Sequence, residues 1–275
     1  MRLIRRYWVD VAAFVAAFLV FVVPFIFILL TAVKDRTAAA EFSFSWPDSW
    51  HAVDNIREVL ATRDGMFMTA MKNSVVLTVV SVTIIVVVAS MIGFTLDRRR
   101  DKVATTVSAL IFIGLMLPPA IVPTIYVLQE LRLFKTLPGL ILVEVAFNLS
   151  YATLLFRAFS ATIPRELDEA AILDGCNSWT LFWKVVFPLM RPVMISVILT
   201  MSVFIWSDFV NPLYFLPGSD NATVQLTLFN FQSQFSNSWN LLFMNVLLIT
   251  IPPLLLFLAF NKKIVAGMTS GALKG

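Results

Sequence analysis

The sequence predicts an all-α membrane protein with six transmembrane helices. Hydrophobic residues make up 59% of the 275 residues and charged residues only 14%. In soluble domains, about 45–50% of the residues are apolar and about 25% are charged. The apolar residues also gather in long runs without a charge, at 11–33, 73–96, 103–129, 192–207 and 221–261. A helix needs about 20 apolar residues to cross roughly 30 Å of hydrocarbon. We therefore expect one transmembrane domain over residues 1–275 with short connecting loops.

The runs and the turn signals between them place the six spans. They cover about 8–33, 71–96, 103–130, 138–160, 191–211 and 240–261. The fourth span has the weakest pattern, because Glu144 interrupts it. Pro118 and Pro119 should break the third span inside the membrane, since proline cannot continue a helix and the freed carbonyl groups need partners there.

The distribution of Lys and Arg predicts the orientation. With both termini on one side, that side receives 14 of the 21 basic residues. Cytoplasmic loops are the ones enriched in positive charge, so both termini are expected in the cytoplasm. This use of the basic residues also explains the net charge of +4 without a nucleic-acid partner.

Several chemistries have no matching residues. One cysteine, Cys176, excludes an internal disulfide and a multi-cysteine metal site, and one histidine, His51, excludes paired-histidine metal motifs. The sequence has no phosphate-binding G-x-x-x-x-G-K-S/T loop, no G-x-S-x-G elbow and no H-E-x-x-H motif. The first apolar run is too long for a cleavable signal, and no small-residue cleavage site follows it. We expect no catalytic residue, no metal and no cofactor on this chain.

The longest inside connection, at about 161–190, has room for a short helix. Pro164 suits a first helical turn, where Glu166, Asp168 and Glu169 would face the positive end of the helix dipole. Gly175 is placed to end the helix in a left-handed cap. One face holds the small or short side chains that could pack on a partner, namely Leu167, Ala170, Ala171 and Asp174. From periodicity alone, a solvated connector helix is an equal alternative.

This loop resembles the EAA loop of ABC-importer permeases. Glu169-Ala170-Ala171 is followed after three residues by Gly175, and after nine more by Val185-Val186-Phe187-Pro188, where the family has Ile-x-Leu-Pro. The chain is also similar over nearly its whole length to the maltose-type carbohydrate permeases. The residues that carry this similarity are Leu117-Pro118-Pro119 with Pro123, Trp206–Phe209 with Pro212, and the tail from Val265 to Gly275.

The resemblance implies a subunit of a type I importer in a prokaryotic cytoplasmic (inner) membrane. It implies a second permease, usually a different chain, two cytoplasmic ATPase subunits that hold ATP and magnesium, and an extracytoplasmic solute-binding protein. The loop helix would be the coupling helix, with Glu169 facing a basic group of an ATPase subunit. The tail at 262–275 would also contact the ATPases, through residues that include Gly267, Gly271 and Lys274.

Polar residues within the spans indicate a solute path, because polar groups in a bilayer usually face the bundle interior. The candidates are Glu144, Asn148, Tyr151, Trp206, Asp208 and Asn211. Each has a structural alternative: Glu144 could be an interfacial charge, and Asn148 and Tyr151 could bond to the partner permease. Ser196 and Thr200 could bond to their own backbone.

The leading hypothesis is a permease for an oligosaccharide or a related sugar derivative, without catalysis of its own. A permease of the same scaffold for a non-sugar solute is the near alternative, against which the tail argues. A gradient-driven carrier would need a carboxylate relay, for which Glu144 and Asp208 are candidates, but the EAA spacing would then be a coincidence.

Overall fold

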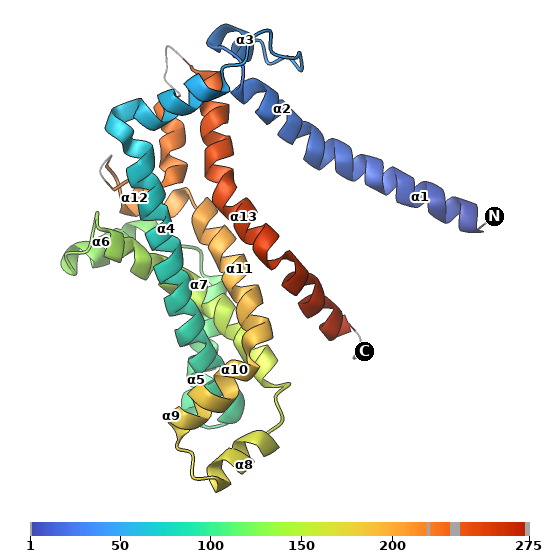
Figure 1. Ribbon diagram of the computed structural model, residues 1–275. Coiled ribbons are helices and arrows are strands. Elements are labelled where there is room, and N and C mark those ends of the chain that lie inside the picture. The colour runs from blue at the N-terminus through green and yellow to red at the C-terminus, as the bar shows by residue number, and fades with distance from the viewer. Residues whose placement is uncertain (1, 219–220, 232–236, 273–275) are drawn as a thin grey trace. The chain divides into compact units, whose positions relative to one another are not determined.

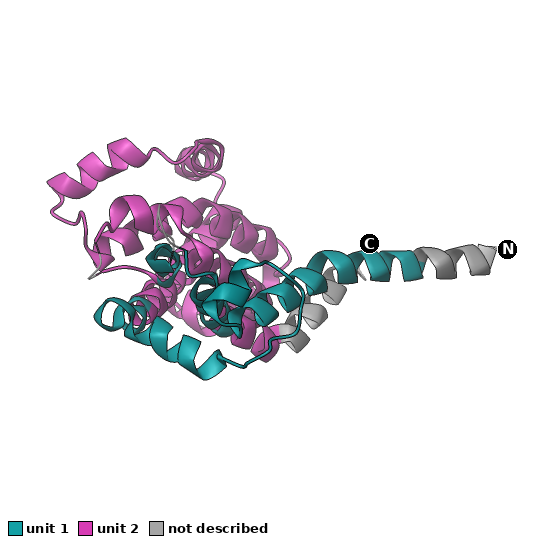
Figure 2. Cartoon of the chain, turned by 90° about the horizontal axis from the view of Figure 1, so that it is seen from above, with its two compact units in different colours: residues 1–70, 224–251 teal, residues 71–223, 252–275 magenta. Residues whose placement is uncertain are grey.

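In a computed structural model, all the regular secondary structure of the described residues is helical, and loops and turns connect the helices (Figure 1). The structure describes residues 2–218, 221–231 and 237–272, and the side chains of residues 10–260 within these ranges. Two compact units divide the chain, and Figure 2 colours them separately: residues 1–70 with 224–251, and residues 71–223 with 252–275. Two segments, α4 (Ala52–Arg98) and α13 (Trp239–Ala272), contribute residues to both units. Residues 62–65 of α4 have non-helical backbone angles, so α4 consists of two helices joined at a kink.

The first unit opens with a long apolar helix. Its parts are α1 (Arg2–Ala17), a π-helical stretch η1 (Phe18–Val22) and α2 (Val23–Ala32). The short α3 (Arg36–Ala40) follows, begun by Asp35, whose carboxylate accepts hydrogen bonds from the amides of Thr37 and Ala38. The unit is completed by the start of α4, by the 3₁₀ segment η3 (Val224–Phe231) and by the start of α13.

Buried amides hold the first unit together. The Asn55 side chain donates hydrogen bonds to the carbonyls of Ala32 (2.8 Å) and Lys34 (2.9 Å), and it accepts one from the Asn240 amide (2.9 Å). The Lys34 ammonium is buried and donates to the Ser43 carbonyl (2.8 Å) and to the Ser45 hydroxyl (3.0 Å). The amide and ammonium donors of Asn55, Asn240 and Lys34 have acceptors, which offsets the cost of burying them, whereas the Asn240 Oδ1 is buried without a partner.

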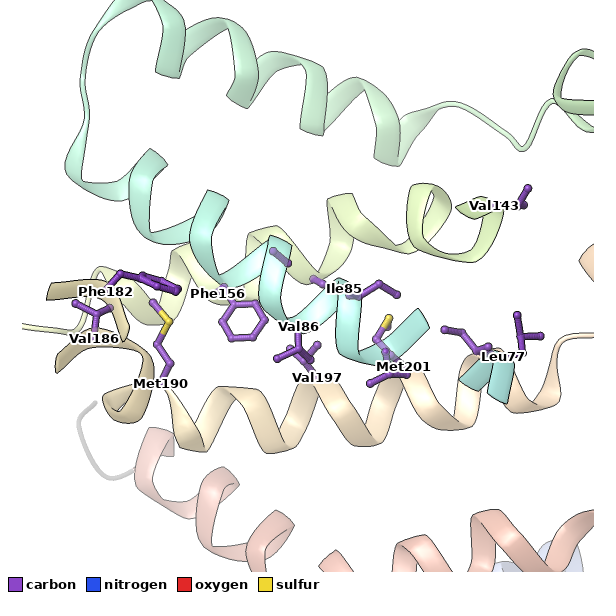
Figure 3. Packing of buried hydrophobic residues seen from close by; sticks show 14 of the residues in the cluster. Leu77, Ile85, Val86, Val143, Phe156, Phe182, Val186, Met190, Val197 and Met201 are labelled. Atoms are coloured by element: carbon purple, nitrogen blue, oxygen red, sulfur yellow. The ribbon is translucent and has the colours of Figure 1, made fainter. Parts of the chain in front are cut away.

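The second unit contains the remaining helices. They are α5 (Lys102–Met116), α6 (Ile121–Glu130), α7 (Leu137–Ser160), α8 (Glu166–Leu173), α9 (Ser178–Thr180), the π-helical η2 (Leu181–Val186), α10 (Phe187–Leu189), α11 (Arg191–Ser207) and α12 (Val210–Phe215). Helix α7 contacts α5, α11 and α12. Its neighbours share a core that runs along the unit (Figure 3), with members Leu77, Ile85, Val86, Phe156, Phe182, Val186, Met190, Val197 and Met201.

Every predicted span has a helical counterpart. Four helices alone are long and apolar enough to cross a membrane, at Asp10–Ala32, within α4, at Leu137–Ser160 and at Trp239–Phe260. The fourth span, which Glu144 made the weakest prediction, is an unbroken helix, because Glu144 is fully buried and hydrogen bonded. The other two candidates are bent pairs, so the described residues provide six spans if each pair counts as one.

The break predicted in the third span is confirmed, whereas the fifth predicted span differs from the structure. The third is not one helix over 103–130, because α5 and α6 meet at 120° around the non-helical residues 117–120. This break lies at Pro118 and Pro119, where the sequence predicted it. The fifth ends at Ser207 and not at Asn211, because Asp208 is in an extended conformation, and α11 meets the segment Ser178–Leu189 at 74°.

Candidate functional site

The loop at about 161–190 contains the predicted helix, α8. The helix begins at Glu166, two residues later than expected, since Arg165 is the flanking residue and Pro164 lies outside the helix. Glu166, Asp168 and Glu169 occupy its first turn, where the exposed backbone amides favour negative charge. Figure 1 shows α8 and α12 toward opposite ends of the second unit.

The end of α8 is a complete Schellman motif. Gly175 has φ +83°, as the prediction of a left-handed cap requires. Its amide donates to the Ile172 carbonyl (2.9 Å), and the Cys176 amide donates to the Ala171 carbonyl (2.9 Å). A Cβ on Gly175 would meet nothing within 4 Å. The need for glycine therefore comes from the backbone conformation and not from crowding within the chain.

Most of the predicted partner-facing surface of α8 is exposed in this chain. Of the expected face of Leu167, Ala170, Ala171 and Asp174, only Ala171 is buried in this chain. Asp168 is the other buried residue of the helix. Leu173 is 88% exposed, and Glu169 is also exposed. Most of α8, including three members of that face, is therefore free to meet another protein.

Asp168 is held by Arg98, the last residue of α4. The Arg98 Nε donates to Asp168 Oδ2 (2.6 Å), and its Nη2 donates to the Ile163 carbonyl (3.1 Å). This contact was not predicted from the sequence, because Arg98 falls in a cluster of basic residues that is explained by topology alone. No spacing rule connects residues 70 positions apart.

The end of the EAA-like motif belongs to the core. Pro188 is half-buried in the one-turn helix α10. Phe182, Val186 and Met190 on the same segment point into the core cluster (Figure 3). The Asn177 side chain begins the segment by accepting a hydrogen bond from the Thr180 amide (2.8 Å). This half of the motif therefore fixes the loop to the bundle.

A second candidate site is a polar cluster around Glu144 on α7. Glu144 is fully buried. Its Oε1 accepts a hydrogen bond from the Asn211 amide (3.1 Å), and its Oε2 accepts one from the Asn148 amide (3.3 Å). The carboxyl of Asp208 lies close enough to that of Glu144 to interact with it electrostatically. One oxygen of Asp208 accepts a hydrogen bond from the Val210 amide (2.9 Å), and the other is buried without a partner.

This cluster lies beside a cavity of about 950 Å³. Asn148, Asp208 and Asn211 contribute polar groups to its wall, as do Thr200 and Ser207. Aromatic rings line it too, namely Phe147, Phe204 and Phe209. The cavity therefore offers acceptors, donors and apolar ring faces together.

Two predicted path residues lie elsewhere. Tyr151 is 43% exposed and is not part of the cavity wall. Trp206 is buried and lines a separate apolar cavity of about 120 Å³ with Pro252 and Pro253. Asp208, two residues later, lies beyond the end of α11 and lines the larger cavity instead.

The predicted tail contacts lie outside the described side chains. Gly267 and Gly271 fall in the last part of α13, and Lys274 falls beyond the described residues. Within the described part of the chain, no group of three or more His, Cys, Asp or Glu side chains is arranged to hold a metal ion.

Residues 89–270 match the profile of a family described as the inner membrane component of binding-protein-dependent transport systems. The chain belongs to this family. Members of the family are permease components of transporters, so the chain is a transport protein of the inner membrane. The match includes α8, the Glu144 cluster and the cavity beside it.

The similarity to known permeases extends over nearly the whole chain. A probable ABC transporter permease, YurM of Bacillus subtilis, is 29% identical over 98% of this chain and 91% of its own length. MelC of the same organism, a melibiose/raffinose/stachyose import permease, is 28% identical over 92% of this chain and 91% of its own. Among solved structures, a chain of a bacterial ABC transporter that imports the polysaccharide alginate has a TM-score of 0.81 at 19% identity, with 95% and 98% of the two chains covered.

Proposed function

We propose that this chain is a permease subunit of an ABC importer for an oligosaccharide or a related sugar derivative. Membership of the family supports the transport role. The sugar class is supported by the relative MelC, which is named for melibiose, raffinose and stachyose. The wall of the cavity near Glu144 agrees with it, because sugar hydroxyls need scattered donors and acceptors and sugar rings stack on aromatic faces.

The main support for the coupling role is the structure of α8. The helix is closed at its end by the Gly175 cap, held at Asp168, and otherwise exposed. Such a helix can enter the cleft of an ATPase subunit and move with it as a rigid body. The exposed Glu169 would meet a basic group there, and Leu173 would supply apolar contact.

ATP is hydrolysed by two partner ATPase subunits in this proposal, and this chain contributes no catalytic residue. A second permease, usually a different chain, completes the path, and an extracytoplasmic binding protein delivers the solute. Both termini lie in the cytoplasm, where Gly267, Gly271 and Lys274 of the tail contact the ATPase pair. Binding of ATP and of the loaded binding protein shifts the complex between two conformations, because each has different affinity for them.

Glu144, Asn148, Asp208 and Asn211 form part of the solute path. The unpartnered oxygen of Asp208 is buried, and it would accept a hydrogen bond from a solute hydroxyl once a change of conformation exposes it. Tyr151 and Trp206 are assigned to packing against lipid, the partner permease or the chain itself, because they do not line this cavity.

The test is to purify the chain with the partners that accompany it and to measure ATP hydrolysis in lipid vesicles. The binding protein is loaded in turn with raffinose, trehalose, a maltodextrin or glycerol phosphate. Stimulation of hydrolysis by a carbohydrate supports the proposal. Inorganic phosphate and an amino acid are added to the panel, and stimulation by one of these two alone would show the near alternative, a permease for a non-sugar solute.

The coupling role has its own control pair. Glu169→Lys should abolish the stimulation while the protein remains in the membrane. Glu166→Lys changes the same charge in the same turn of α8, and it should retain most of the stimulation. Equal stimulation in both variants and in the unmodified chain would reject the assignment of α8 as the coupling helix.

A further inference from the structure

We propose that Arg98 is the positioning residue that fixes the coupling helix to the membrane helix α4, through its ion pair with Asp168. The inference rests on the proposed coupling role of α8. It adds a route by which movement of α8 reaches a spanning helix. Arg98 lies far from the EAA-like motif in the sequence, and Asp168 immediately precedes the first residue of the motif, Glu169.

Arg98 makes three hydrogen bonds from one guanidinium. Its Nε donates to Asp168 Oδ2 (2.6 Å), its Nη1 to Asp97 Oδ2 (2.6 Å) and its Nη2 to the Ile163 carbonyl (3.1 Å). The guanidinium carbon also lies 5.3 Å from the centre of the Phe94 ring. A planar fork with three fixed acceptors holds its partners in one geometry, which a flexible ammonium group does not.

The location of the pair suits it for transmission. Arg98 is the last residue of α4, and Asp168 is the third residue of α8. A cation at a helix C-terminus and an anion at a helix N-terminus are each stabilised by the helix dipole. The pair therefore joins the end of one helix to the start of another at the point where both charges are favoured.

The pair is not an ordinary surface ion pair. The Arg98 and Asp168 side chains are 15% and 13% exposed, whereas the neighbouring pair Arg99–Asp101 is 57% and 43% exposed. Exposed pairs contribute little because solvent screens them and their side chains stay mobile. A partly buried pair with additional hydrogen bonds is screened less, so its loss should free α8.

Apart from the Arg98–Asp168 pair, the contact between α8 and the end of α4 is small. On α8, only Asp168 and Ala171 are buried, and Arg165 adds one long hydrogen bond to the Asp97 carbonyl (3.3 Å). On the other side, α4 lies directly against α7 at Gly93, so force applied at Arg98 enters a packed helix. Without the pair, α8 would keep its helical form and its contact with η2 but lose its fixation to α4.

The experiment measures the pose of α8 and its binding to the ATPases, with no solute needed. A spin label at Leu173→Cys, in a Cys176→Ser background, reports the mobility of α8 by EPR. Urea-washed membranes that contain the full permease pair are then titrated with the ATPase subunits that purify with it. The variants are Arg98→Gln, Asp168→Asn, the two together, and Arg98→Lys, with Arg99→Gln as the matched control.

We expect Arg98→Gln and Asp168→Asn each to increase label mobility and to weaken ATPase binding by about tenfold, the usual scale for a charge-assisted hydrogen bond. The double variant should lose no more than Arg98→Gln alone, because that variant already removes the contact with Asp168 together with those to Asp97 and the Ile163 carbonyl. Arg98→Lys should recover part of the affinity, and Arg99→Gln should behave as the unmodified chain. The melting temperature of the permease pair should stay unchanged, because a structural role would lower it.

Two results would overturn the inference, and they are distinguishable. If Glu169→Lys weakens ATPase binding while Arg98→Gln and Asp168→Asn leave both affinity and mobility unchanged, the coupling role stands and the anchor is rejected. If Glu169→Lys also leaves ATPase binding unchanged, α8 is not the ATPase contact and the proposed function fails at that point. Losses that add in the double variant would likewise reject a direct pair.

Discussion

Gly175 occupies a backbone conformation that most residues reach only at a cost. At φ +83° an L-residue brings its Cβ against the following carbonyl oxygen, which costs about 1–2 kcal/mol. Because no other atom lies within 4 Å of the Cβ position, side-chain volume within the chain should matter little. Substitutions here therefore separate backbone strain from crowding.

We expect Gly175→Asn to keep the α8 cap and Gly175→Val to weaken it. Asparagine tolerates the left-handed region and valine does not, with a strain of about 1–3 kcal/mol for the latter. Hydrogen exchange of the Gly175 and Cys176 amide positions measures the cap directly. Equal protection in the two variants would contradict this account of the glycine.

Glu144 is the acceptor for two buried amide groups, so its removal should destabilise the protein. Glu144→Leu leaves the Asn211 amide without its partner, at a cost of about 1–3 kcal/mol, whereas Glu144→Gln keeps an acceptor of the same shape. Thermal unfolding in detergent should show a lower midpoint for the leucine variant only. Glu130→Leu, at an exposed position, is the control and should change little.

The polar cluster was largely predictable from the sequence, whereas the Arg98 anchor was not. Glu144 and Asn148 are four residues apart on one predicted helix, so they had to share a face. Asn211 and Asp208 were named as candidates, but only the turn after Ser207 brings them to Glu144. Arg98 carries no local signal of its partner, because a basic residue at the end of a span is expected for topology alone.

At the scale of elements, two glycines allow helices to approach closely. A Cβ on Gly93 of α4 would lie 2.8 Å from both the Phe156 Cβ and the Arg157 amide nitrogen of α7. A Cβ on Gly114 of α5 would lie 2.7 Å from the Ser150 hydroxyl, also on α7. Small residues at such contacts are typical of helix packing in membranes, and here they set the distance of α4 and α5 from α7.

Gly93→Val should force α4 and α7 apart. The atoms in the way belong to the backbone and a Cβ, which cannot rotate aside, and overpacking of this kind costs about 1–3 kcal/mol. The apparent melting temperature of the purified protein should fall. Thr83→Val on the exposed side of α4 should leave it nearly unchanged, and the same midpoint for both variants would refute the close contact.

The start of α5 should depend on pH. The Asp101 carboxylate accepts a hydrogen bond from the Ala104 amide (2.9 Å), and this bond, together with Arg99, holds the pKa of Asp101 below its usual value of 3.8. A lowered pKa means that the cap is present above about 3.8 and is lost as pH falls through the folded-state pKa. Exchange of the Ala104 amide should therefore quicken only at acidic pH, and Asp101→Asn should remove that dependence.

The elements show where sequence patterns stop being sufficient. Two adjacent prolines predicted the break of the third span, because proline removes a helical hydrogen bond. They did not predict the 120° angle, since the direction of a chain after a break depends on what it packs against. The bend before α11 was missed for the same reason: Pro192 sits in the first turn of α11, a position equally compatible with an isolated helix start.

For the whole molecule, the bent pairs decide the topology. If both pairs cross the membrane there are six spans, and α8 lies on the opposite side from the segment at 34–70. If neither crosses there are four, and both segments lie on the same side. We expect six, because the basic residues then favour one side.

Thiol labelling tests this directly. Cysteines are placed at Trp50 or at Leu173, both exposed, in a Cys176→Ser background. A membrane-impermeant maleimide on intact cells should label the Trp50→Cys chain and should reach Leu173→Cys only after the membrane is opened. Labelling of both positions in intact cells would establish the four-span arrangement.

The first span has a consequence for the surrounding lipid. It runs for 23 residues from Asp10 to Ala32, and only 6% of its most apolar window is buried. At 1.5 Å per residue the helix is about 35 Å long, against roughly 30 Å of hydrocarbon, so it is long enough to span the bilayer with some tilt. With so little packing to fix this tilt, bilayer thickness sets it: longer acyl chains should bring the helix upright, and shorter ones should lean it further.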